Sequence, residues 1–236
     1  MRVAVLIPFH KEQEKLDKCK AAVLTSKTSG FEIDLCVEND SDTETGFTKT
    51  VNRGLKQIVH TGNYAYALVL NQDCYLQPEA IEALFKFMQS HPKCGIAGIK
   101  QLSSEDNDQI IHGGTKQAYP AGVHEGGLVS RGDCAKSKKV PWVNGAIMMI
   151  RLETLLDTGL LDENMIMFGS DSDISHTMRA RGWECWYCAE AVGVHEQIAS
   201  RGTSEKMQKQ LKLDMLYFKD KWISGELFED LVLELL

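Results

Sequence analysis

The stretch VAVLIPFHKEQEKLDKCKAAVLTSKTSGFEIDLCVENDSD, residues 3–42, decides the fold. It opens with an apolar run of strand length that ends at Pro8, and residues 11–24 then carry apolar side chains at helical spacing. A second strand pattern follows over residues 31–37. Because a strand, a helix and a strand in this order form a βαβ unit, the stretch predicts two parallel strands and an α/β protein.

The same alternation continues along the next part of the chain. The expected elements are a helix over 46–59, a strand over 66–70, a helix over 80–89 and a strand over 96–99. This order predicts a mostly parallel sheet flanked by helices, which is a Rossmann-like architecture. Ligands of such sheets bind at the carboxyl ends of the strands, where Pro8 and residues 38–42 and 71–73 fall.

The rest of the chain is less regular. Residues 101–139 are polar and rich in glycine, which indicates either an excursion over the active face, with a hairpin, or a plain surface insertion. Regular structure is then expected as a central strand within 140–150, a helix over 151–158, strands over 184–188 and 192–194, and helices over 204–222 and 226–236.

We predict one sheet domain over residues 1–203 and a C-terminal helical extension over 204–236. Residues 1–100 and residues 101–203 would be the two halves of this domain. The extension could cover one side of it, pair two subunits or contact a membrane surface. Its acidic end argues against a strong anchor to anionic lipid.

Composition narrows the possible partners and compartments. The 236 residues carry a formal net charge of -7, which argues against nucleic acid as the main partner. The apolar runs are too short to span a membrane and no signal segment opens the sequence, so we expect a cytoplasmic protein, peripheral to a membrane at most. Seven cysteines without regular spacing fit reduced thiols. Cys185 and Cys188 form a CxxC in a strand pattern, so their side chains should point to opposite faces and bind no zinc.

One segment points to catalysis. Residues 169–174, GSDSDI, place Asp171 and Asp173 at the start of an expected helix. The helix dipole would keep Asp171 ionised there, as a general base requires. The alternative is that Ser170 and Asp173 only form a capping box.

Taken in chain order, the motifs resemble those of family 2 glycosyltransferases of GT-A fold, particularly the rhamnosyltransferase-like branch. The likeness covers nearly the whole chain. It implies that residues 1–100 form the nucleotide-binding half of the domain and residues 101–203 the acceptor and catalytic half, whose acceptor side the extension could cover. The matching motifs are VLIPFH at 5–10, VENDSD at 37–42, GF at 46–47 with VNRG at 51–54, LNQD at 70–73, VNGA at 143–146, LLDE at 160–163, SDSD at 170–173 and VH at 194–195.

This resemblance implies an inverting, metal-dependent enzyme that moves a sugar from a nucleotide sugar, UDP- or dTDP-linked, to a hydroxyl of a glycan or another acceptor. Asp171 would be the general base, and Asp73 and His195 would hold Mn²⁺ or Mg²⁺. Glu38 would accept a hydrogen bond from an N–H of the uracil or thymine ring, which Pro8 and His10 would border. The residues implied in nucleotide and donor binding are Pro8, His10, Glu38, Asn39, Asp40, Asn52, Asn71, Gln72 and Asp73.

For the acceptor, the resemblance implies Trp142, Asn144, Gly145 and Ser170, although Trp142 could equally be a core residue. Asp173 is expected to be a helix cap and structural acid. A Q-x-x-R-W motif, typical of the processive enzymes, does not occur in the sequence, which favours the addition of single sugars.

Two departures from the family pattern keep other functions open. Asn71 replaces the first acid of the DxD motif, and Ser170 replaces the glutamate beside the base. These changes allow a catalytically weakened module that binds a sugar or nucleotide without turnover. A nucleotidyltransferase is the other alternative, but it would need a glycine-rich phosphate loop after the first strand, where this chain has residues 8–12, PFHKE.

Overall fold

The computed structural model describes residues 1–115, 129–130, 134–196 and 204–224. Its centre is a ten-stranded sheet, whose main path runs in the order β2-β1-β3-β9-β5-β10-β4. These strands are β1 Arg2–Phe9, β2 Glu32–Asn39, β3 Tyr66–Leu70, β4 Cys74–Leu76, β5 Cys94–Ser103, β9 Ile147–Arg151 and β10 Glu184–His195. Three short strands lie off this path: β6 Gln109–His112, β7 Val129–Ser130 and β8 Lys138–Lys139.

The sheet is mainly parallel, as the strand and helix alternation predicts. β1 pairs in parallel with β2 and β3, and β5 pairs in parallel with β10. β9 is inserted between β3 and β5 and runs antiparallel to both, so β3 and β5 point the same way. The carboxyl ends of β1, β2, β3, β5 and β10 therefore meet at one edge, together with the amino end of β9. We call this the active edge.

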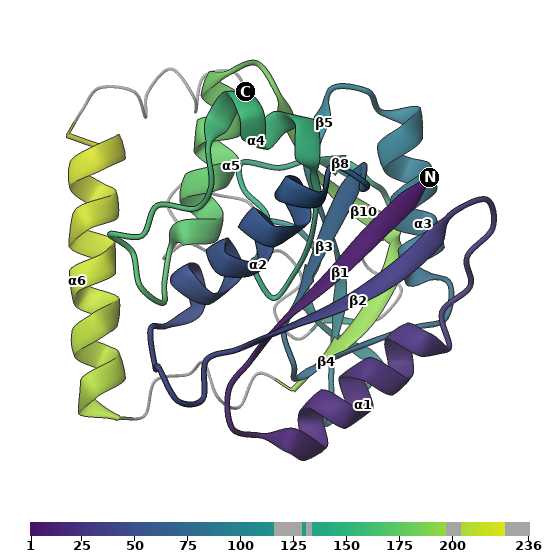
Figure 1. Cartoon of the computed structure of the whole chain (residues 1–236), viewed down its shortest axis with the longest axis horizontal. Coiled ribbons are helices and arrows are strands. Elements are labelled where there is room, and N and C mark those ends of the chain that lie inside the picture. Colours follow the sequence, from purple (N-terminus) through teal and green to yellow (C-terminus); the bar gives the residue numbers. More distant parts are fainter. Residues whose placement is uncertain (116–128, 131–133, 197–203, 225–236) are drawn as a thin grey trace.

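Helices cover both faces of the sheet (Figure 1). α1 Gln13–Leu24 and α3 Ala80–Ser90 pack on one face, and α2 Phe47–Thr61, α4 Leu152–Thr158 and α5 Ser170–Ala180 pack on the other. Of the strands beneath, β1, β3 and β9 are mostly apolar, and all five side chains of β3 are buried. Strands buried on both faces have this composition because neither face meets water.

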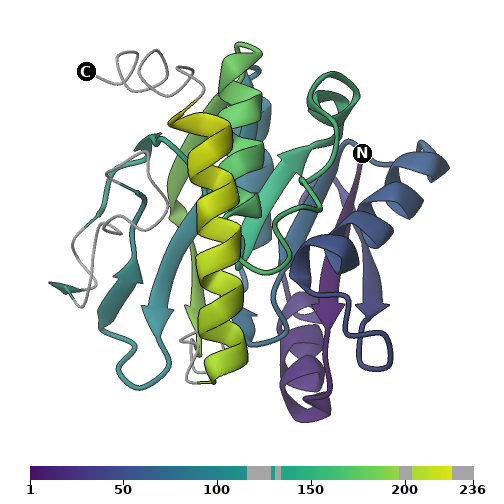
Figure 2. The same cartoon turned by 90° about the vertical axis from the view of Figure 1, so that its left-hand side faces the viewer.

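The last helix lies outside these layers. α6 Glu205–Trp222 lies on the outside of α5, at the left of Figure 1 and in front of the sheet in Figure 2. Phe218 and Trp222 of α6 pack with Met165 in a small separate apolar cluster. Asp214 of α6 is buried and accepts the backbone N–H groups of Ile166, Met167 and Phe168 at 2.9–3.1 Å. The helix thus holds the segment that leads into α5.

Most predicted elements are confirmed, with three corrections. Residues 184–194 form one strand, because a bulge between Cys188 and Val192 lets β10 stay paired with β5 instead of ending. The strand expected within 140–150 starts only at Ile147, since the preceding residues turn at the active edge. β4 was not predicted at all, because three residues are too short for a periodic pattern.

Other expectations fall partly outside the described residues. In the 101–139 excursion, β6 and β7 pair antiparallel, so a hairpin is present there. The helix expected over 226–236 lies outside the described residues. Cys185 and Cys188 do belong to opposite faces, each in a different core cluster. No helix in the described residues is long and apolar enough to cross a membrane.

Candidate active site

Two predicted metal ligands meet at the active edge. Asp73 lies just before β4 and His195 ends β10, and these strands pair antiparallel. The distance from His195 Nε2 to Asp73 Oδ2 is 3.6 Å, and both side chains are at least nine-tenths buried. Burial raises the pKa of Asp73, but the hydrogen bond and charge of His195 outweigh it, so this pKa lies below its ordinary value. Asp73 is therefore ionised at neutral pH.

Gln101, near the end of β5, orients this histidine. Its Oε1 lies 3.0 Å from His195 Nδ1. Because an amide oxygen only accepts, this contact places a proton on Nδ1, so Nε2, which faces Asp73, is the nitrogen that a metal ion would bind. The other end of Gln101 donates from Nε2 to Asn144 Oδ1 at 3.2 Å. The fully buried Gln101 thus connects the Asp73 and His195 pair with the turn before β9.

That turn continues to Asp171. Asn144 Oδ1 also accepts the Ala146 N–H at 3.0 Å, which closes the turn. The Gly145 N–H donates to Asp171 Oδ2 at 2.7 Å, and the Ser172 N–H donates to Asp171 Oδ1 at 2.8 Å. A Cβ atom on Gly145 would lie 3.0 Å from the Asp171 Cβ, which is closer than ordinary van der Waals contact, so any larger residue would have to displace Asp171. Asp171 is half-buried in the first turn of α5, as the sequence indicates.

Asp173, two residues further, has a different environment. The capping-box alternative is wrong, because the N-cap of α5 is Gly169 and the helix has no side-chain cap. Instead Asp173 accepts a hydrogen bond from Trp222 Nε1 at 2.7 Å and pairs with Lys221 at 2.8 Å. Asp173 is therefore a structural acid, as expected, but it binds side chains of α6 and does not cap α5. Burial raises the pKa of Asp173 against the opposing effect of Lys221.

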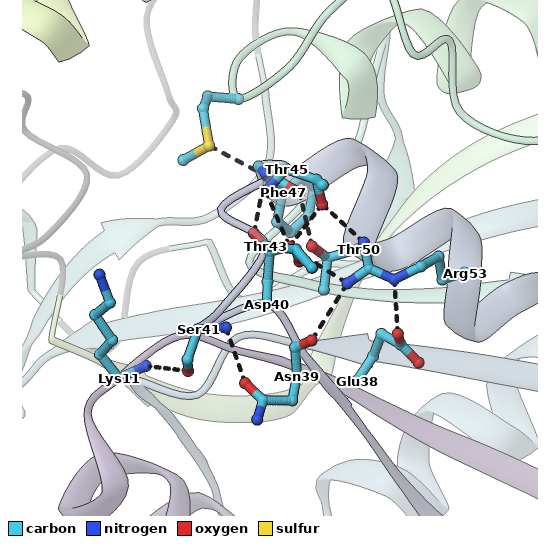
Figure 3. A network of polar contacts seen from close by, with 12 residues as sticks. Lys11, Glu38, Asn39, Asp40, Ser41, Thr43, Thr45, Phe47, Thr50 and Arg53 are labelled. Carbon is cyan, nitrogen blue, oxygen red and sulfur yellow. Dashed lines mark hydrogen bonds and ion pairs between the residues drawn. The ribbon is translucent and has the colours of Figure 1, made fainter.

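On the donor side, a polar network joins the end of β2 to α2 (Figure 3). Asp40 is its centre, and it accepts the Thr43 and Thr45 hydroxyls at 2.7 and 2.6 Å and the Thr45 and Gly46 N–H groups at 3.0 Å. Burial raises the pKa of Asp40, but these donors outweigh it and hold the pKa well below its ordinary value. Asp40 therefore shapes the loop over 41–46, and both of its carboxylate oxygens accept hydrogen bonds from that loop.

Glu38 and Asn39 border that network. Glu38 Oε1 accepts Arg53 Nε at 2.7 Å, and Oε2 has only a long contact of 3.4 Å from Gln57. Asn39 Oδ1 accepts the Ser41 N–H at 2.9 Å. Arg53, which sequence reasoning missed, fixes the Glu38 carboxylate. The only signal for Arg53 was its place inside the VNRG motif.

Pro8, His10, Asn71 and Gln72 surround the ends of β1 and β3. Pro8 is half-buried and His10 is exposed. The Gln72 side chain accepts the His10 N–H at 2.6 Å and donates to the His10 carbonyl at 3.1 Å, so it positions His10. Asn71 Oδ1 is buried and meets no hydrogen-bond donor among the described residues. An orphaned buried acceptor suits a ligand or water that supplies the missing donor.

Three predicted site residues are enclosed in the protein. Asn52 exchanges hydrogen bonds with the Leu161 backbone, which ties α2 to the segment before α5. Ser170 is 1% exposed and accepts the Thr48 hydroxyl. Trp142 is 3% exposed, and its backbone is held by Thr115. As placed, none of these side chains offers a surface to a sugar or nucleotide, and the core alternative describes Trp142.

The donor set at Asp73 and His195 fits a divalent cation. One carboxylate and one imidazole nitrogen suit Mn²⁺ or Mg²⁺ when phosphate oxygens and water supply the other ligands. Among the described residues, the one group of three potential metal ligands consists of Asp73, Cys74 and His195, whose ligand atoms lie within 4.8 Å of one another. Cys74 was not predicted, because no spacing in the sequence links it to His195.

Several solved structures share this fold. A structure of GalNAc-T7 with UDP, GalNAc and Mn²⁺ superimposes with a TM-score of 0.60 at 14% identity, over 83% of this chain and 44% of that chain. Two structures of TarS from S. aureus, one of them residues 1–349 with UDP, give TM-scores of 0.54 at 12% and 13% identity. They cover 85% and 82% of this chain and 37% and 60% of those chains. The fold is therefore that of GT-A glycosyltransferases, and the chain spans less than two thirds of these neighbours.

The sequence comparison gives the family. The profile described as glycosyltransferase like family 2 matches residues 17–213, which is well over half of the chain. The chain therefore belongs to the family 2-like glycosyltransferases. No curated protein sequence matches it.

Proposed function

We propose that this chain transfers a single sugar from a nucleoside diphosphate sugar to an acceptor hydroxyl, with inversion at the anomeric carbon. The observation that carries the proposal is the path of polar contacts from Asp73 through His195, Gln101 and the Asn144–Gly145 turn to Asp171. It connects a candidate metal pair to a candidate base at the edge of the sheet where α/β proteins bind their ligands. Family membership supports the same reaction class.

The donor would lie along the ends of β1, β2 and β3. Glu38 Oε2 is the carboxylate oxygen with the weaker protein contact, so it is the one to accept an N–H of a uracil or thymine ring, with Pro8 and His10 beside the ring. Asn71 Oδ1 would accept a donor from the nucleotide sugar or its water. These groups suit a UDP- or dTDP-sugar as the donor. They are also consistent with the activity of a rhamnosyltransferase-like enzyme.

Asp73 Oδ2 and His195 Nε2 would hold Mn²⁺ or Mg²⁺. A bound divalent cation neutralises the charge that develops on the departing diphosphate. Gln101 keeps the His195 lone pair turned to this position. The residues of this chain thus supply the orientation on which the leaving group depends.

Asp171 would take the proton of the acceptor hydroxyl while the acceptor oxygen forms its bond to the anomeric carbon. The bond from that carbon to the diphosphate breaks on the opposite side, and the nucleoside diphosphate leaves. The N–H groups of Gly145 and Ser172 fix the carboxylate in place without protonating it. Asn144 and the Gly145 turn would border the acceptor, whereas Asn52, Ser170 and Trp142 support the site from behind.

Within this proposal, residues 1–100 serve mainly the nucleotide and residues 101–203 the metal, base and acceptor. Strands of both parts alternate in one sheet, so the division is one of roles. Within the C-terminal extension, α6 positions the base, and pairing of two subunits through the extension stays a prediction.

The test is donor consumption by the purified full chain with UDP-, dTDP- and GDP-sugars, in Mn²⁺ or in chelator. We expect metal-dependent release of nucleoside diphosphate from one donor. Asp171→Asn should lower this rate by roughly 10²–10⁴-fold, because it removes a general base. The exposed carboxylate variant Asp157→Asn is the matched control and should keep the wild-type rate.

Binding measurements on the same panel separate the alternatives. Nucleotide binding without any turnover, with acceptors of several classes present, would favour a binding module over a transferase. Release of pyrophosphate from a nucleoside triphosphate and sugar phosphate would instead indicate a nucleotidyltransferase.

A further inference from the structure

Cys74 lies beside the two candidate metal ligands for a structural reason. It begins β4, and its register partner in the antiparallel ladder is His195 of β10. Directly opposite residues in an antiparallel pair carry their side chains on the same face, with Cβ atoms roughly 4.5–5.5 Å apart. The Cys74 Sγ also lies 3.9 Å from Asp73 Oδ1. Strand pairing therefore brings a thiol, an imidazole and a carboxylate together.

We propose that Cys74 is a third ligand at this site, and that it lets a thiophilic divalent cation such as Zn²⁺ compete with Mn²⁺. The proposal rests on the proposed function, because it uses the same Asp73 and His195 atoms. Zn²⁺ and Mn²⁺ would compete because both would bind through Asp73 and the single Nε2 atom of His195, which can coordinate only one ion at a time. Mn²⁺ prefers the oxygen and nitrogen donors alone, whereas zinc gains from the sulfur.

The distances agree with this coordination. Zinc bonds of about 2.0–2.3 Å to nitrogen, oxygen and sulfur, in tetrahedral geometry, place neighbouring ligand atoms roughly 3.3–3.6 Å apart. The distance from His195 Nε2 to Asp73 Oδ2 is 3.6 Å, the distance from Cys74 Sγ to Asp73 Oδ1 is 3.9 Å, and one ligand atom from each residue lies within 4.8 Å of the others. A side-chain adjustment would bring the three ligand atoms to bonding distance of one ion and leave a fourth position for water or a phosphate oxygen.

Charge balance favours the same ion. A metal-bound cysteine loses its proton, so the site would combine one thiolate, one carboxylate and a neutral imidazole with a divalent cation. Their charges cancel, which matters because Cys74 is fully buried and Asp73 and His195 are only 7% and 6% exposed. With Mn²⁺ and a protonated thiol, the carboxylate would cancel only one of the two positive charges of the ion. An anionic diphosphate would then have to cancel the other.

The test uses Cd²⁺, a zinc-like ion whose bond to a thiolate gives an ultraviolet charge-transfer band. We expect the purified chain to develop this band on titration with Cd²⁺ alone, and we expect Cd²⁺ to displace Mn²⁺ measured by its electron paramagnetic resonance signal. Cys74→Ser should abolish the band. The same variant should lower the ratio of Cd²⁺ affinity to Mn²⁺ affinity. We expect a decrease larger than the roughly 10- to 100-fold cost of losing a residue that only hydrogen-bonds to a metal ligand.

Two further variants keep the result interpretable if Cys74→Ser folds poorly. His195→Ala leaves the thiol in place and should still weaken the band. Cys36→Ser, which removes a half-buried thiol on β2, is the matched control and should keep it. A band that persists in Cys74→Ser, or that is unchanged in His195→Ala, would overturn the proposal.

The same titration distinguishes this inference from the proposed function. If Cd²⁺ and Mn²⁺ bind and Asp73→Asn weakens both, but Cd²⁺ gives no thiolate band, Cys74 ligation is wrong while the metal pair stands. If neither ion binds, the metal part of the proposed function fails as well.

Discussion

Two buried carboxylates, Asp40 and Asp214, have the same structural role on opposite sides of the active edge. Each accepts successive backbone N–H groups of a loop that borders the candidate site. Asp40 holds Thr45 and Gly46, only five and six residues away, whereas Asp214 holds residues 46 to 48 positions away in the sequence. The donor-side loop is therefore organised locally, and the loop before the base depends on a distant helix.

This difference has a functional consequence. The side-chain hydrogen bonds of Asp40 and Glu38 all stay within the end of β2, its loop and α2 (Figure 3). The base-side segment also depends on Lys221 and Trp222, which hold Asp162 and Asp173. We therefore expect nucleotide binding and turnover to respond separately to changes in these two regions.

The largest effect is expected from Asp214→Ala. It leaves three N–H groups of residues 166–168 without their buried acceptor, which should lower the free energy of unfolding by about 2–4 kcal/mol. Loss of their position would displace Asp171, and a misplacement near 1 Å costs roughly 10²-fold in rate. Chemical denaturation and turnover kinetics measure the two effects.

The matched control is Asp220→Ala, which removes an exposed carboxylate from the same helix and should change neither quantity. Donor affinity of Asp214→Ala should stay near the wild-type value. A loss of donor affinity equal to the loss of turnover would show that the two regions are not separable.

Gln101 tests the path that joins the two regions. Gln101→Leu removes both the contact to His195 Nδ1 and the contact to Asn144. Removing the orienting partner of a metal-bound histidine typically costs 10- to 100-fold in metal affinity or activity, so we expect about this loss of Mn²⁺ affinity.

Gln101→Glu sharpens the same test, because its oxygens still accept from His195 Nδ1 but no longer donate to Asn144. We expect it to keep metal affinity and to lose turnover. Equal Mn²⁺ affinity in Gln101→Leu and the wild type would argue against an orienting role.

The smallest effect is expected from Asp40→Asn, about 1–3 kcal/mol less stability at neutral pH, since an amide replaces an acceptor of several donors. The pKa of Asp40 is lower in the folded chain than its ordinary value of 3.8. The stability it contributes is therefore present above pH 3.8 and is lost as the pH falls through the folded pKa.

Denaturation curves at several pH values check this expectation. The difference between the wild type and Asp40→Asn should be constant above pH 3.8 and shrink below it. The neighbouring exposed Asp42→Asn should show no such difference. A difference that grows on acidification would contradict the assignment.

Sequence reasoning works well where a feature is periodic or compact. The alternation of strands and helices predicts the sheet, and the motifs place Asp73, His195, Asn144, Gly145 and Asp171, which the structure brings to one edge. Sequence reasoning fails where one sequence pattern is compatible with two different structures. Ser170 and Asp173 form a capping-box pattern, yet Asp173 instead binds Lys221 and Trp222, which no local pattern can reveal.

The sequence by itself determined the family, the α/β fold and the acids at the strand ends, because hydrophobic periodicity and short motifs are local properties of the chain. Only the tertiary structure decided which polar groups meet. Strand pairing opposes Cys74 to His195, β5 carries Gln101 between His195 and Asn144, and α6 delivers Asp214 to the segment before the base. These contacts join residues far apart in sequence, and long-range packing, not local preference, fixes them.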